Sequence, residues 1–140
     1  MTREEFNTYL ESIGGLVNGW KTNAPPITDG YFMQHEAGWY ELEKHLIEDL
    51  IKLGWNKEVC QVKEKFGGLR FYINHGSDEI YKRIQQAESE SYEICECCGT
   101  REEIGRTKGW ITTSCAPCAM KIFENKSEPT DFNMFWTKNT

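Results

Sequence analysis

Apolar residues recur at helical spacing in three stretches of the sequence, and each stretch predicts an α-helix. The stretches cover residues 3–13, 39–53 and 78–94. Thr2 lies just before the first stretch and Glu5 follows three residues later, a pair that can form a capping box at a helix start. We therefore expect three amphipathic helices, each with one apolar stripe that faces a core.

The sequence between the helical stretches follows two other patterns. Residues 16–37 contain the turn signals Asn-Gly, Pro-Pro and Asp-Gly and show no periodicity, so we expect a long loop, which in a small domain often has a function. Residues 59–74 contain two apolar-rich runs on either side of Gly67-Gly68. This arrangement predicts a β-hairpin with the two glycines as its turn.

The predicted hairpin would place Lys65 opposite Arg70 and divide its side chains between two faces. One face is apolar, with Glu64 as the exception. The other face is polar and holds Gln61, Lys63, Lys65, Arg70, Tyr72 and Asn74. Like charges opposed across two strands disfavour folding, and an anionic ligand would relieve their repulsion.

We therefore take four residues of the polar face as candidate ligand-binding residues. They are Lys63, Lys65, Arg70 and Tyr72. Arginine suits this role because its guanidinium binds phosphate or carboxylate in bidentate geometry. The alternative is a solvated sheet face whose cations meet acidic residues from elsewhere in the chain.

The cysteine spacing adds a metal site to this picture. The chain has 140 residues and six cysteines. Cys95 and Cys98 form one Cys-x-x-Cys pair, and Cys115 and Cys118 form a second pair after sixteen intervening residues. Zinc takes four thiolates in a tetrahedron, and two pairs at this separation can supply them. The sequence therefore predicts one Zn²⁺ held by these four residues; unliganded thiols and two disulfides are the alternatives.

The residues around the cysteine pairs favour one type of zinc finger. Gly105 and Gly109 lie between the two cysteine pairs and indicate a short hairpin there. Residues 116–125 can form a helix after it. A knuckle, a hairpin and a helix in this order are typical of a treble clef, with a zinc ribbon as the second choice. Cys97 is expected to be a bystander that faces solvent, and Cys60 a small buried residue in a strand.

The chemistry and composition argue against several classes of function. Four thiolates close the coordination shell, so the zinc is expected to be structural, and no nucleophile stands beside a suitable base in the sequence. A net charge of -6 argues against nucleic-acid binding. The chain has no apolar run of membrane-spanning length and its first residues are polar, so we expect a cytoplasmic protein with no membrane contact.

Together these patterns predict a single α+β domain over residues 1–140. We expect helices packed on a small antiparallel sheet, with a four-cysteine treble-clef, zinc-ribbon-like clip at about 92–125. The tail, residues 127–140, is polar except for a few apolar side chains. Its aromatic residues, which we expect to dock on the domain, are Phe132, Phe135 and Trp136.

Three segments together resemble a family of small, mostly uncharacterised phage and bacterial proteins. They are residues 63–72 (KEKFGGLRFY), the Cys95-x-x-Cys98-Gly99 knuckle, and residues 109–119. The resemblance covers roughly residues 38–119 and implies a phage or prophage setting. Small phage proteins of this size often bind host components, including defence proteins or their nucleotide signals.

The leading hypothesis is a non-enzymatic, zinc-stabilised binding protein that takes an anionic, nucleotide- or phosphate-like ligand on the basic hairpin face. With the resemblance, this suggests a role against host defence, in the host cytosol if a phage encodes the protein. The alternative is a protein-interaction module that inhibits a host protein. A zinc-finger nucleic-acid binder is the weakest of the three hypotheses.

Overall fold

The computed structural model describes residues 1–125 and 131–140; residues 127–130 of the expected tail lie outside this description. The three predicted helices are α1 (Arg3–Ser12), α2 (Tyr40–Lys52) and α3 (Asp78–Ser91). The capping box forms as expected, because the backbone N–H of Glu5 donates to the Thr2 hydroxyl at 3.2 Å and the Glu5 carboxylate accepts from the Thr2 N–H at 3.0 Å.

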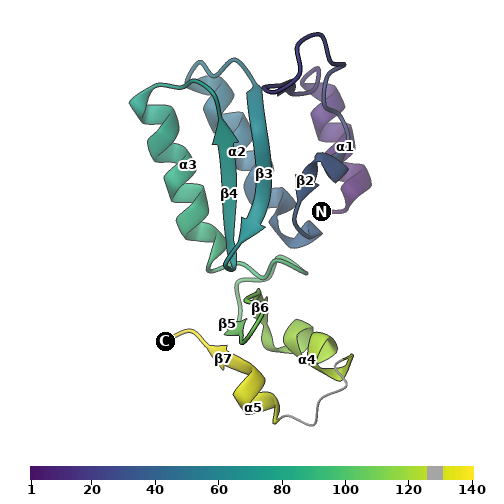
Figure 1. Ribbon diagram of the computed structural model, residues 1–140, viewed down its shortest axis with the longest axis vertical. Coiled ribbons are helices and arrows are strands. Elements are labelled where there is room, and N and C mark those ends of the chain that lie inside the picture. Colours follow the sequence, from purple (N-terminus) through teal and green to yellow (C-terminus); the bar gives the residue numbers. More distant parts are fainter. Residues whose placement is uncertain (126–130) are drawn as a thin grey trace.

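The larger sheet is built around a central strand, β3. Its strands are β1 (Val17–Asn18), β2 (Met33–Gln34), β3 (Glu58–Lys65) and β4 (Gly68–Ile73). β4 pairs antiparallel with one edge of β3, while β1 and β2 pair parallel with the other edge (Figure 1). The segment expected to be a loop, residues 16–37, thus supplies two strands. Strands of two residues are too short to show an alternating pattern in the sequence.

The same segment contains a short 3₁₀ helix, η1 (Gly30–Phe32), and a second one, η2 (Ala37–Trp39), begins at its last residue. η2 runs directly into α2, so the aromatic residues at the predicted helix start, Trp39 and Tyr40, are both buried. The indole Nε1 of Trp39 donates to the carbonyl oxygen of Ile94 at 3.0 Å, beyond the end of α3. This bond ties the start of α2 to the segment that carries the first cysteine.

The turn of the hairpin is Phe66-Gly67, one residue earlier than predicted. Lys63, not Lys65, therefore lies opposite Arg70, and the expected pairing is wrong. Both turn residues have positive φ angles, 53° and 84°, as a type I′ turn requires. The pairing shifts by two residues along β4, and an even shift keeps the strand side chains on their predicted faces. Phe66 leaves the apolar face and is exposed.

Tertiary contacts explain why the turn lies there. Gly68 belongs to β4, and a Cβ at this position would collide with the ring of Tyr92. The carboxylate of Glu64 accepts a hydrogen bond from the N–H of Gly67 at 2.7 Å, which accounts for an acidic residue on the apolar face. Neither contact could be inferred from the local spacing of the glycines.

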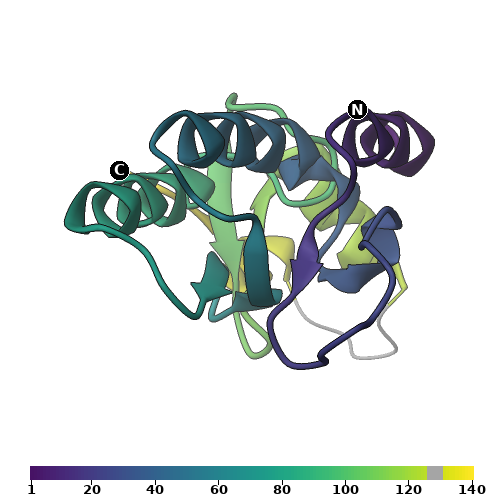
Figure 2. The same cartoon turned by 90° about the horizontal axis from the view of Figure 1, so that it is seen from above.

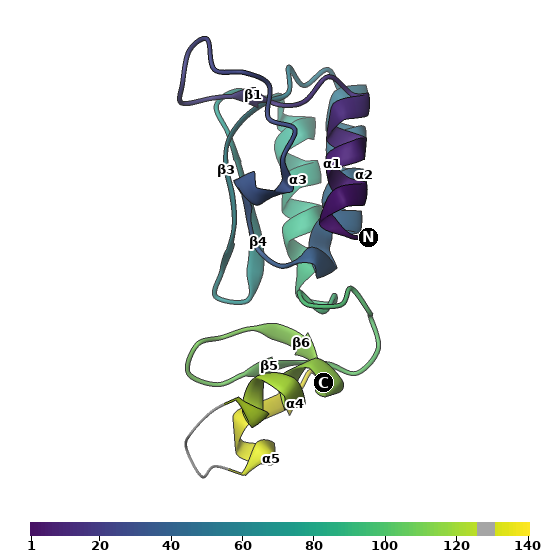
Figure 3. The same cartoon turned by 90° about the vertical axis from the view of Figure 1, so that its right-hand side faces the viewer.

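The main core lies between the sheet and the helices. α2 and α3 cover one face of the β3–β4 hairpin, and α1 packs beside α2 (Figures 2 and 3). The core's fully buried members include Phe6, Leu10, Trp39, Leu46, Ile47, Leu50, Val59, Val62 and Leu69. No helix in the described ranges covers the opposite face of the sheet, which carries the predicted polar side chains. We call this face the outer face.

The C-terminal part forms a second, smaller sheet and a short helical layer. Its elements are β5 (Ile104–Thr107), β6 (Thr113–Cys115), α4 (Ala116–Glu124), α5 (Phe132–Phe135) and β7 (Trp136–Lys138). β5 pairs antiparallel with β6 and β7. Phe132 and Phe135 of the tail pack against Phe123 of α4, with ring centroids 5.7 and 5.5 Å apart. The tail aromatics therefore dock on the protein itself.

These elements confirm the α+β fold with a four-cysteine clip. The clip has the treble-clef order of knuckle, β5–β6 hairpin and α4. One detail differs, because the parallel strands β1 and β2 make the larger sheet mixed and not purely antiparallel. Among the helices of the described ranges, none has the length and apolar character needed to cross a membrane.

Candidate metal centre and outer sheet face

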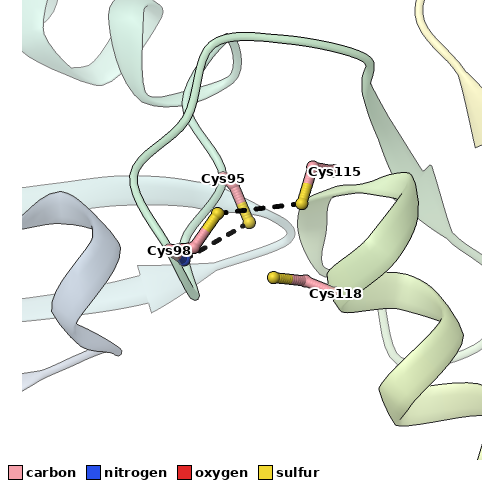
Figure 4. A group of neighbouring side chains, drawn as sticks. All are labelled: Cys95, Cys98, Cys115 and Cys118. Atoms are coloured by element: carbon pink, nitrogen blue, oxygen red, sulfur yellow. Dashed lines mark hydrogen bonds between the residues drawn. The ribbon is translucent and has the colours of Figure 1, made fainter.

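Three elements bring the four predicted cysteines together. Cys95 and Cys98 lie in the knuckle after α3, Cys115 ends β6, and Cys118 lies in the first turn of α4 (Figure 4). Their sulfur atoms all lie within 4.8 Å of one another, and the Sγ atoms of Cys98 and Cys115 are 3.7 Å apart. Thiolates bound to one ion at ~2.3 Å in a tetrahedron lie about 3.8 Å apart. The four residues are thus positioned to hold a metal ion.

Neighbouring backbone N–H groups and the Cys97 thiol favour the metal-binding form of Cys95 in the first cysteine pair. The N–H of Cys98 approaches the Sγ of Cys95 at 3.5 Å, and Gly99 turns the chain with a φ of +82°. The Cys97 thiol lies within hydrogen-bonding reach of Cys95, and this bond, helped by the backbone N–H groups, holds the pKa of Cys95 well below its ordinary value. The thiolate, which is the ligand form, is therefore favoured at Cys95.

The second pair of sulfurs behaves differently. Burial raises the pKa of both Cys115 and Cys118 because it disfavours their thiolates. A metal ion would displace these protons on binding, so its affinity must fall as the pH falls. Cys97 was expected to face solvent, but it is half-buried against the cysteine cluster. It is a fifth thiol beside a set of four that already closes a tetrahedron.

Glu96 attaches the knuckle to the main core, a role that the sequence did not reveal. Its carbonyl oxygen accepts from the N–H of Gly38 at 2.7 Å, and its buried carboxylate accepts from the N–H of Glu36 at 3.1 Å. Its own N–H donates to the carbonyl oxygen of Thr113 at 3.0 Å. These partners are far from Glu96 in the sequence, so no local pattern could have indicated them.

A buried pair, His35 and Glu43, lies near this junction and was also missed. Both side chains are fully buried, and the Nε2 of His35 lies 3.0 Å from the carboxylate of Glu43. The Nδ1–H of His35 donates to the carbonyl oxygen of Glu36 at 2.7 Å. Burial alone would lower the pKa of His35, but Glu43, the bond to Glu36 and the charge of Glu96 raise it overall.

The outer face brings together part of the predicted ligand-binding set. Lys63 lies opposite Arg70, and Tyr72 follows Arg70 on the same face of β4. Lys65 lies at the hairpin tip opposite Gly68, and its Nζ is 5.7 Å from the ring centroid of Phe66. In residues 1–125 and 131–140, none of the three cations has an acidic group within 4.0 Å.

Arg70 is held in place by neutral acceptors. Its guanidinium donates to the carbonyl oxygen of Leu69 at 3.0 Å and to the hydroxyl of Tyr92 at 3.1 Å. Tyr92 reaches the edge of β4 from the end of α3. These bonds orient the arginine, and the nearby carboxylate of Glu88 offsets part of its charge without forming an ion pair within 4.0 Å.

A cavity of about 970 Å³ lies between the end of α3 and the β5–β7 sheet. Arg101, Arg106 and Lys138 line it, but so do Glu93 and Glu103. Arg101 already lies 3.6 Å from the carboxylate of Glu90. Because its charges are mixed and partly paired, this cavity suits an anion less well than the outer face does.

Comparison with protein-family models, with curated proteins and with solved structures gave no match. A functional assignment for this chain must therefore come from its own residues and their geometry.

The pKa shift of His35 predicts a pH-dependent stability. A histidine whose pKa is raised in the folded state contributes stability that is complete below its unfolded pKa, about 6.5, and is lost as the pH rises through the folded value. We expect the free energy of unfolding of the native protein to fall as the pH rises from about 6.5 through the folded pKa of His35. This fall should be absent in His35→Gln. Urea unfolding of both metal-saturated proteins, from below pH 6.5 to above the folded pKa of His35, measures this difference in stability. The same dependence of stability on pH in both proteins would contradict the prediction.

The cysteine geometry predicts one metal ion per chain. Cys115→Ser removes a buried ligand and should lose the ion, together with cooperative unfolding of the C-terminal part. Cys97→Ser should keep the ion, since four ligands remain, and Cys60→Ser is a control far from the cluster. Elemental analysis of the purified proteins checks this; metal retained by Cys115→Ser but lost from Cys97→Ser would show that the ligand set is wrong.

Proposed function

We propose that the protein is a zinc-stabilised binding protein, not an enzyme, that takes an anionic ligand on its outer sheet face. Zinc is the metal we assign because four cysteine thiolates in a tetrahedron favour zinc or iron, and zinc serves as a structural ion that undergoes no redox chemistry. Four sulfur ligands leave no open position for a substrate or an activated water. On this proposal the ion stabilises the C-terminal part and takes no part in chemistry.

The single observation that carries the anion proposal is the pair formed by Lys63 and Arg70. They face each other across β3 and β4, and within the described residues neither forms an ion pair within 4.0 Å, although the charge of Glu88 acts on Arg70 from a longer distance. Like charges opposed in this way destabilise a hairpin. An anion between them turns that repulsion into two charge-assisted hydrogen bonds.

The resemblance noted in the sequence gives this proposal a setting. In a phage or prophage protein, an anion-binding face would serve to capture a host signal or cofactor and so to counter host defence. This setting rests on the family likeness of residues 63–72 and 109–119 and adds no residue to the site.

The proposal predicts that Lys63→Ala and Arg70→Ala each weaken anion binding at least about tenfold, because each removes one charged donor, worth ~1.5–3 kcal/mol. Lys52→Ala, which removes an exposed lysine from the end of α2, should leave binding unchanged. Calorimetric titration with a panel of phosphate-, sulfate- and carboxylate-bearing compounds measures these affinities. The proposal is wrong if no compound in the panel binds, or if Lys52→Ala weakens binding as much as Arg70→Ala does.

A specific observation also favours the second candidate, a protein-interaction module. Phe66 is 68% exposed and Trp110 is 82% exposed, and both line one cavity of about 280 Å³ between the tips of the two hairpins. Phe66 occupies a left-handed backbone conformation that a bulky residue adopts at a cost. Phe66 adds strain to the turn and buries little of its ring, so its presence does not serve the stability of the fold. Contact with a partner protein would explain why an aromatic residue stands there.

This candidate predicts opposite effects of one substitution on stability and on binding. Phe66→Asn creates an Asn-Gly turn, which tolerates positive φ, and should raise the free energy of unfolding by about 0.5–1 kcal/mol. It should also weaken capture of a protein partner, as should Trp110→Ala, because each removes an aromatic contact. Urea unfolding and pull-down assays measure the two effects. If both variants still capture the partner protein, the interaction surface at Phe66 and Trp110 is ruled out.

A further inference from the structure

A second cavity opens on the outer face beside β2, and its walls are aromatic. Its volume is about 500 Å³, and its lining residues are Trp20, Tyr31, Phe32, Gln34, Cys60 and Gln61. Trp20 is 78% exposed and Tyr31 is 70% exposed. Both come from the segment between β1 and β2, which extends past the sheet on its open side (Figure 3).

The two exposed rings are attached to ordered turns. The side-chain oxygen of Asn18 accepts from the backbone N–H of Trp20 at 2.8 Å, and that of Asp29 accepts from the N–H of Tyr31 at 2.9 Å. The guanidinium carbon of Arg3 lies 3.7 Å above the centre of the Tyr31 ring. The backbone bonds fix the two turns and Arg3 packs on the Tyr31 ring, so both aromatic residues are presented at the surface, where a base can stack on them.

The cavity floor offers the hydrogen-bonding groups that a base edge needs. The Nε2 of Gln61 donates to the Oε1 of Gln34 at 3.1 Å. This bond uses one polar atom of each amide and leaves the oxygen of Gln61 and the nitrogen of Gln34 for a ligand. An acceptor and a donor side by side are complementary to the edge of a nucleobase, which glutamine recognises in bidentate fashion.

The cavity adjoins the proposed anion site. Gln34 pairs with Lys63 in the parallel β2–β3 ladder, and Lys63 lies opposite Arg70. Gln61 and Lys63 are neighbours on the same face of β3, about 6–7 Å apart along the strand. That separation suits a nucleoside monophosphate, whose base and phosphate are joined by a single ribose.

We propose that the outer face binds a nucleotide, with its base in the aromatic cavity against Trp20 and Tyr31 and its phosphate on Lys63 and Arg70. This inference rests on the anion site proposed above and adds a separate subsite for the base. The base stacks on the rings and meets the two glutamine amides, while the cations neutralise the phosphate.

The experiment compares ribose 5-phosphate with AMP, GMP, CMP and UMP in calorimetric titrations. Stacking of one base on an aromatic side chain predicts that at least one of the four nucleotides binds about 5- to 150-fold more tightly than ribose 5-phosphate. Trp20→Ala should remove most of this difference and leave the affinity for ribose 5-phosphate unchanged. Lys63→Ala should weaken binding of both ligands, and Tyr81→Ala, which removes an exposed aromatic residue from α3, should change neither affinity.

The outcomes separate the base subsite from the anion site. If all four nucleotides bind no more tightly than ribose 5-phosphate, or if Trp20→Ala leaves the difference intact, the base subsite is overturned while the anion site stands. If none of the five compounds binds at millimolar concentration, the nucleotide inference is overturned. The anion site itself then fails only if the sulfate- and carboxylate-bearing compounds do not bind either.

Discussion

The hydrogen bonds of Glu96 are the constraint on which the arrangement of the two parts depends. Glu96 lies in the knuckle between Cys95 and Cys98. Its hydrogen bonds join the knuckle both to the segment that leads into α2 and to β6. The approach is so close that a Cβ at Gly38 would collide with the carbonyl oxygen of Cys95. A metal ion that fixes the knuckle therefore also fixes residues 36–39, and through them the position of β2 beside the outer face.

The features that could be predicted from the sequence are those encoded in local spacing. Helical periodicity located α1, α2 and α3, and the two Cys-x-x-Cys pairs located the metal cluster. The register of the hairpin was missed because the role of Gly68 is set by Tyr92, and the junction was missed because Glu96 and Glu36 lie sixty residues apart in the chain. Even so, the predicted division between an apolar and a polar face held, since strand alternation survives an even shift in pairing.

The two parts of the molecule are stabilised in different ways. The cysteine cluster replaces a hydrophobic core in the C-terminal part, where the second cluster of buried apolar residues is small. The helices bury one face of the larger sheet and leave the other to solvent. On that open face, within the described residues, Lys63 and Arg70 form no ion pair within 4.0 Å, and Trp20 and Tyr31 are exposed. On the proposed function, this surface holds a ligand next to a metal site that takes no part in chemistry.

The order of the two clusters along the chain has a consequence for synthesis. Every member of the main hydrophobic core lies at or before Ile94, and the metal cluster begins at Cys95. A chain that emerges from the ribosome can thus bury its core before Cys118 has been added, and chains tend to fold from the N-terminus as they are made. On the proposed zinc binding, metal uptake becomes the last step of maturation, and a cell short of zinc would accumulate chains with a folded N-terminal part and an open C-terminal part.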